Sequence, residues 1–99
     1  MKIKVQSIHF DADAKLLRFV EEKVDKLFQY YDHIIDSEVF LRIDNSDKSE
    51  NKVTEIRIKT PGKILFAKER CKTFEEATDE AVEALRRQIK RHKEKIRGN

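Results

Sequence analysis

Residues 54–72 have the sequence TEIRIKTPGKILFAKERCK, which predicts two strands joined by a short turn. Before Pro61-Gly62, Ile56 and Ile58 alternate with Glu55, Arg57 and Lys59, the period of two that is typical of a strand with one buried face. After it, residues 64–72 are expected to form the next strand. Residues 60–63, Thr-Pro-Gly-Lys, form a turn by composition, although Pro-Gly suits a type II turn better than a tight hairpin turn. If the turn is symmetric, four apolar residues pair across the strands and face the core: Ile58 with Leu65, and Ile56 with Ala67.

The opposite face of this hairpin carries cations and two large apolar side chains: Arg57, Lys59, Ile64, Phe66, Lys68 and Arg70. A turn with an odd number of residues would exchange the two faces, because a one-residue slip reverses every side chain. Together with Phe40 of the preceding strand, Ile64 and Phe66 can form a base-stacking platform for RNA. They can equally contact a protein partner, and the sequence leaves both interpretations open.

A strand and a helix begin the chain. Residues 2–6 alternate polar and apolar, which predicts a half-buried strand. From Leu16 to Tyr31 apolar residues recur every three to four positions, which predicts an amphipathic helix that ends near Tyr31. Asp11 or Asp13 can cap its first turn.

A second strand over residues 38–43 and a polar loop over residues 45–51 lead into the hairpin. After the hairpin, Thr73 with Glu76 three residues later is a capping-box signature that opens a second helix. The apolar stripe of this helix consists of Phe74, Ala77, Ala81, Leu85, Ile89 and Ile96. We expect these side chains to be buried.

The order of elements is therefore β-α-β-β-β-α, which predicts an α+β fold. The first two strands are joined by a helix and should run parallel through a right-handed crossover, while the others form an antiparallel meander. Each helix has one apolar stripe, so both should cover one face of a four-stranded mixed sheet as a two-layer sandwich. The 99 residues predict a single domain spanning residues 1–99.

The single cysteine, Cys71, excludes an internal disulfide and is expected to be a small, semi-buried residue. The chain has no signal-peptide pattern and no run of about 18 apolar residues, so we expect a cytoplasmic protein without a membrane partner. His9, His33 and His92 lie far apart, with no ligand framework around them, which argues against a metal site. We find no phosphate-cradling glycine loop or nucleophile motif, and we expect no enzyme, cofactor or small-molecule substrate.

The charge of the second helix changes sign halfway along. Its charged residues are all acidic from Thr73 to Glu83, and almost all basic afterwards: Arg86, Arg87, Lys90, Arg91, Lys93, Lys95 and Arg97. This order complements the helix dipole and concentrates positive charge, which attracts phosphate. A solvated face is the alternative, but segregated charges forgo i,i+4 pairing and so favour a phosphate-contacting surface. Cations on the first helix either extend this surface or pair with nearby acids: Lys15, Arg18, Lys23 and Lys26.

Two segments resemble a known family. Residues 19–32, FVEEKVDKLFQYYD, resemble the first helix of the ribosome hibernation-promoting factor family, within the ribosome-associated inhibitor and sigma-54 modulation protein superfamily. Residues 85–95, LRRQIKRHKEK, resemble its second helix. The resemblance implies a fold similar to double-stranded RNA-binding domains.

The resemblance also implies a function. Such a protein binds the small ribosomal subunit and its rRNA in the decoding channel, over the mRNA and tRNA sites, and silences translation during stress or stationary phase. The implied rRNA contacts are Arg87, Lys90, Arg91, Lys93 and Lys95, with Lys23 and Lys26 in addition. Arg86 stands where relatives often carry an acid. A homodimer or other protein contact through Phe40, Ile64 and Phe66, and general binding of double-stranded RNA, are the alternatives.

Two features depart from the family pattern. At residues 74–79, FEEATD replaces an aromatic residue followed by Ala-Ala-Ile-Asp, and the aromatic residue has moved by one position. The sequence stops at Asn99, so the expectation is the short form, which pairs ribosomes only with a separate factor.

Overall fold

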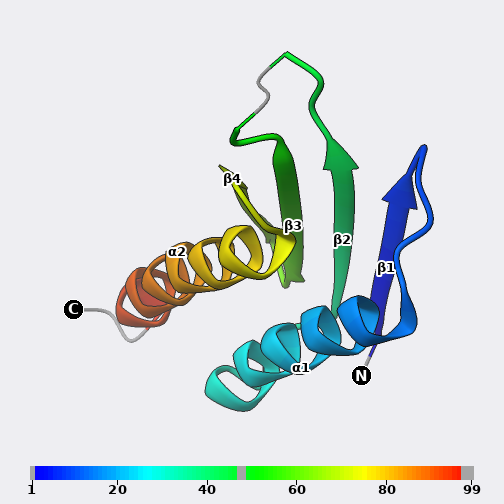
Figure 1. The fold of residues 1–99 in the computed structure, drawn as a ribbon. Helices are drawn as coiled ribbons and strands as arrows, with labels where there is room; N and C mark the ends of the chain where they lie inside the picture. The colour runs from blue at the N-terminus through cyan, green and yellow to red at the C-terminus, as the bar shows by residue number, and fades with distance from the viewer. Residues whose placement is uncertain (1, 47–48, 97–99) are drawn as a thin grey trace.

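The computed structural model describes residues 2–46 and 49–96, apart from the side chain of Ile96. Its elements are β1 (Ile3–Ile8), α1 (Ala14–Tyr30), β2 (Asp36–Ile43), β3 (Lys52–Thr60), β4 (Lys63–Cys71) and α2 (Phe74–Ile96). The strands form one sheet in the order β1-β2-β3-β4, and both helices cover the same face (Figure 1). The predicted α+β sandwich is confirmed. Part of the predicted loop, the side chain of Ile96 and Arg97 lie outside the described part of the chain.

The strand directions and the register of the hairpin also agree with the sequence. β1 runs parallel to β2, and β2–β3 and β3–β4 are antiparallel. Ile58 lies opposite Leu65 and Ile56 opposite Ala67. Gly62 has φ +78°, the value that a type II turn needs at its third residue. Because the turn has two residues, Ile56, Ile58, Leu65 and Ala67 lie on the helix side of the hairpin.

The core lies between this sheet face and the two helices. Its fully buried side chains include Val39, Leu41, Ile56 and Ile58 from the sheet, Val20 and Val24 from α1, and Leu85 and Ile89 from α2. The hydroxyls of Thr54 and Thr78 lie 3.3 Å apart and pair β3 with α2 inside this core. Phe74 stacks on Phe10 with 5.1 Å between ring centroids, so the shifted aromatic residue still has a packing partner.

Side-chain caps fix the start of both helices. The Oδ1 atom of Asp13 accepts a hydrogen bond of 2.7 Å from the Leu16 amide at the start of α1. The Thr73 hydroxyl accepts one of 3.1 Å from the Glu76 amide at the start of α2. Each bond satisfies an amide that has no partner within the helix.

Asp13, and not Asp11, is therefore the cap of α1, and this choice can be tested. We expect Asp13→Ala to lower the free energy of unfolding by about 1 kcal/mol, because the first turn loses its acceptor. Asp11→Ala should change it by less than about 0.5 kcal/mol, as for an ordinary surface site. Urea unfolding measures both values. Equal losses in the two variants would contradict the assignment.

Candidate nucleic-acid interface

The acidic first half of α2 contacts α1. Lys23 extends from α1 and its Nζ atom lies 3.1 Å from Asp79 Oδ1, and 5.4 Å from the centre of the Phe19 ring. The Lys23 side chain is only 31% exposed. The structure thus places this predicted rRNA contact against the acidic half of α2, where its charge is already matched.

The C-terminal ends of the two helices meet at Lys93. Its Nζ atom lies 4.6 Å from the centre of the Tyr30 ring and 3.5 Å from the Tyr30 carbonyl oxygen. A cation at this position suits the last carbonyls of α1, which carry partial negative charge. Lys26 is exposed and lies one turn before Tyr30, on the same side of α1. Lys26 and Lys93 therefore belong to one surface at the helix ends.

Four of the predicted contacts point into solvent: Arg87, Lys90, Arg91 and Lys95. We call them the exposed quartet. Within residues 2–46 and 49–95 their side chains make no hydrogen bond or ion pair. Arg86, by contrast, donates two hydrogen bonds to Glu83 Oε2, at 3.0 and 3.3 Å, which raises the pKa of its guanidinium. The quartet is free to bind an anion, whereas the charge of Arg86 is paired with that of Glu83.

A hollow of about 400 Å³ separates this end of α2 from the β3–β4 turn. Its lining is basic, with Lys63, Arg91 and Lys95 around Leu65, Gln88 and His92. The Gln88 side chain donates a hydrogen bond of 2.9 Å to the Phe66 carbonyl and holds the helix against β4. Lys63 was not among the predicted rRNA contacts, because only the folded hairpin brings this residue close to α2.

His92 is a packing residue. Its ring meets that of Tyr31 edge to face, at 5.9 Å and 89°. Its Nε2 atom is buried and has no hydrogen-bond partner in the described part of the chain. The ring therefore supports the junction of α2 with α1.

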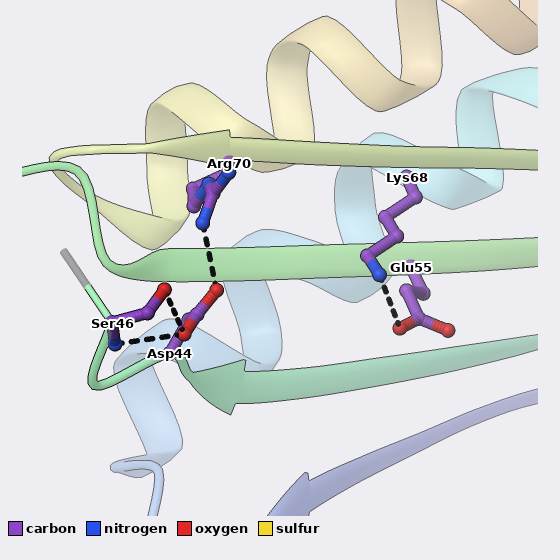
Figure 2. Close-up of polar contacts among 5 residues, drawn as sticks. All are labelled: Asp44, Ser46, Glu55, Lys68 and Arg70. Atoms are coloured by element: carbon purple, nitrogen blue, oxygen red, sulfur yellow. Dashed lines mark hydrogen bonds and ion pairs between the residues drawn. The ribbon is translucent and has the colours of Figure 1, made fainter.

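The open face of the sheet is the face away from the helices. At one end of this face, cations pair with carboxylates of the same protein. Arg70 donates a hydrogen bond of 2.7 Å to Asp44, and Asp44 also accepts bonds from the Ser46 amide and hydroxyl. Figure 2 draws these contacts as dashed lines. These bonds, led by the one from the Ser46 amide, lower the pKa of Asp44. Glu55 forms an ion pair with Lys68, with 3.9 Å between Oε1 and the Lys68 Nζ atom (Figure 2). Glu55 also pairs with Arg42. Cations at this end are thus engaged within the protein.

Cys71 is a structural residue, as expected. Its thiol is buried and donates a hydrogen bond of 2.6 Å to Glu80 Oε2. Burial, and then this neighbouring carboxylate, raise the pKa of the thiol from 9.0 to about 12. The thiol is therefore protonated at neutral pH and a poor nucleophile.

This pKa predicts a specific pH dependence. Between pH 9.0 and about 12 the thiol ionises in the unfolded chain but not in the folded one. Its contribution to the free energy of unfolding is therefore complete below pH 9.0 and is lost as the pH rises toward 12. Urea unfolding of the wild type and Cys71→Ala at rising pH should show stability falling more steeply in the wild type. Parallel pH profiles would refute the assignment.

In the described residues, no three His, Cys, Asp or Glu side chains come together in a way that could hold a metal ion. Over the same residues, neither helix has the length and apolar character needed to cross a membrane.

Comparison with known sequences identifies relatives. The profile of the family described as Sigma 54 modulation protein / S30EA ribosomal protein matches residues 3–97. A ribosome hibernation promotion factor of Bacillus subtilis is 29% identical over 97% of this chain and 50% of its own length. A ribosome hibernation promoting factor of Pseudomonas putida is 27% identical over 96% of this chain and 89% of its own. The chain thus spans half the length of the Bacillus relative.

Solved structures share the fold. The N-terminal domain of Thermus thermophilus Protein Y has a TM-score of 0.77 and 26% identity, covering 93% of this chain and 99% of that one. A ribosomal subunit interface protein from Coxiella burnetii has a TM-score of 0.82, covering 94% and 98% of the two chains. At 20% identity the latter likeness concerns the fold alone.

Proposed function

This chain belongs to the Sigma 54 modulation protein / S30EA ribosomal protein family, and from that premise we propose that it binds and silences idle ribosomes. It binds the small subunit at the decoding channel, over the mRNA and tRNA sites, through rRNA phosphates. The observation that carries this proposal is the exposed quartet on α2, whose charges have no partner in the described part of the chain. The site of action is the cytoplasm, and the whole of residues 1–99 acts as one binding domain.

The quartet is presented on a rigid support. Leu85 and Ile89 lie on the opposite side of the same helix turns and are fully buried, so α2 cannot turn its cations away from a partner. From Arg87 to Lys95 the helix rises about 12 Å, at 1.5 Å per residue. Lys26, Lys63 and Lys93 widen this surface toward α1 and the β3–β4 turn. Cations fixed in this way recognise the shape of an RNA backbone, without reading bases.

Salt dependence tests the electrostatic part of the proposal. With four phosphate contacts, the logarithm of the binding constant should fall with the logarithm of salt concentration at a slope of about −3. Co-sedimentation with purified small subunits, from about 50 to 400 mM salt, measures this slope. An excess of plain RNA duplex separates ribosome binding from general binding of double-stranded RNA. The proposal would be abandoned if the protein stayed in the supernatant at the lowest salt.

A competition experiment tests the decoding channel as the site. Small subunits loaded with mRNA and tRNA should bind the protein much more weakly than empty ones, because the sites overlap. The protein should also inhibit a reporter in a cell-free translation mixture. Equal binding to loaded and empty subunits would place the protein elsewhere on the ribosome.

A further inference from the structure

A second basic surface lies on the open face of the sheet. Here a hollow of about 360 Å³, which we call the open-face hollow, lies over the ends of β1 and β2 and the β3–β4 hairpin. The charged side chains that line it are Lys2, Lys4, Asp36, Glu38, Arg57 and Lys59. In the sheet, Lys4 is opposite Glu38, Glu38 is opposite Arg57, and Arg57 is opposite Phe66. These side chains point away from the helices, so the hollow is separate from the exposed quartet.

The cations of the open-face hollow differ from those at the other end of the same face. Arg42, Lys68 and Arg70 pair with carboxylates, as described above. Within residues 2–46 and 49–95, Lys2, Lys4, Arg57 and Lys59 make no ion pair. The guanidinium of Arg57 lies 5.8 Å from the centre of the Phe40 ring. Free positive charge is therefore concentrated at the hollow.

Large apolar side chains border these cations. Ile64 lines the hollow and is 63% exposed, and Phe66 beside it is 43% exposed. An exposed aromatic ring among cations is the arrangement on which single-stranded nucleic acids stack their bases. The carboxylates of Asp36 and Glu38 add acceptors that can bind the amino groups of bases. A site for bare phosphate would gain nothing from these two carboxylates.

We propose that the open-face hollow binds a nucleotide segment of single-stranded RNA. Lys4, Arg57 and Lys59 hold its phosphates, and Phe66 stacks against a base. This inference rests on the proposed function, since the RNA is the same ribosome's, and it gives the domain RNA contacts on two opposite faces. A second copy of this chain is the less suitable occupant, because two open faces placed against each other would repel. Each open face carries seven cations and four carboxylates: Lys2, Lys4, Arg42, Arg57, Lys59, Lys68 and Arg70, and Asp36, Glu38, Asp44 and Glu55.

Fluorescence anisotropy with a labelled single-stranded RNA of about ten nucleotides tests the hollow directly. The background variant Arg87→Glu/Lys90→Glu/Arg91→Glu removes the α2 surface. In that background we expect the RNA to bind, and Arg57→Glu/Lys59→Glu to weaken binding at least about tenfold and flatten the salt slope by about 1.4. The matched control Lys15→Glu/Arg18→Glu, with the same charge change on α1, should weaken it less than about threefold. Equal weakening by the two pairs would overturn the proposal.

Stacking has its own test. Phe66→Ala should weaken RNA binding about fivefold or more, Phe66→Tyr should restore it, and neither should alter the affinity for inorganic polyphosphate. If polyphosphate binding falls equally, the hollow is not a nucleotide site. If light scattering shows a dimer that Phe66→Ala dissolves while RNA binding is unchanged, a second copy occupies the face and the proposal is wrong.

Co-sedimentation with small subunits separates this inference from the proposed function. If the wild type binds subunits and Arg57→Glu/Lys59→Glu binds as well as its α1 control, the inference fails and the function stands. If the wild type does not bind subunits, the function fails, and the anisotropy measurement still decides whether the hollow binds RNA. Circular dichroism confirms folding of each variant, and Arg57→Gln/Lys59→Gln repeats the test with a milder change.

Discussion

Reversing three cations of the exposed quartet should weaken binding to small ribosomal subunits by about three orders of magnitude at about 50 mM salt. The variant is Arg87→Glu/Lys90→Glu/Arg91→Glu. Each lost phosphate contact removes its share of counterion release, and each new carboxylate repels the backbone. Lys93 is left unchanged because it contacts Tyr30 and its loss would disturb the helix junction. Co-sedimentation across a range of protein concentrations measures the change.

The control carries the same change in net charge at three exposed cations away from the basic end of α2: Lys15→Glu, Arg18→Glu and Lys72→Glu. We expect it to bind within about tenfold of the wild type, since only long-range attraction is lost. Both variants should give the wild-type circular dichroism spectrum. If the control binds as poorly as the test variant, binding depends on overall charge and not on α2.

Shortening Leu85 to alanine should lower the free energy of unfolding by about 2–5 kcal/mol. Leu85 is completely buried between α2 and the sheet, so the change removes apolar contacts and leaves a cavity. For a domain whose total stability is about 5–15 kcal/mol, this is a large fraction. Urea unfolding followed by circular dichroism gives the value.

Lys90→Ala is the matched control on the opposite side of the same helix. Lys90 is exposed and unpaired in the described part of the chain, so stability should change by less than about 0.5 kcal/mol. The two substitutions should therefore separate stability from binding, with Leu85→Ala affecting the first and Lys90→Ala the second. A small loss in Leu85→Ala would show that α2 is held mainly by other contacts.

The fold could be read from the sequence because its signals are periodic and local. A turn symmetric about Pro61-Gly62 predicted the pairing of Ile56 with Ala67, which the structure confirms. One apolar stripe per helix predicted both helices on one face of the sheet. The choice between Asp11 and Asp13 as the cap needed the structure, because both residue types suit that position. Strand ends also moved: β3 begins at Lys52, two residues before its predicted start.

The candidate site was only partly predictable. A helical wheel shows which cations face solvent, and Arg87, Lys90, Arg91 and Lys95 do. It does not show which residues of a neighbouring helix or strand contact a side chain. Lys23 lies beside Asp79, Lys93 lies on Tyr30, and Lys63 reaches the hollow beside α2, and all three depend on segments distant in sequence. Long-range contacts thus decided which cations are free.

The hydrogen bond from Gln88 to the Phe66 carbonyl has a consequence for solubility. β4 is an edge strand, and unpaired backbone groups along such an edge can template the addition of a strand from another molecule. The Gln88 side chain donates a hydrogen bond to one of those carbonyl groups, that of Phe66. Gln88 lies near the middle of α2, the helix that carries the exposed quartet. We therefore expect α2 to hinder the addition of a strand at this point of the edge.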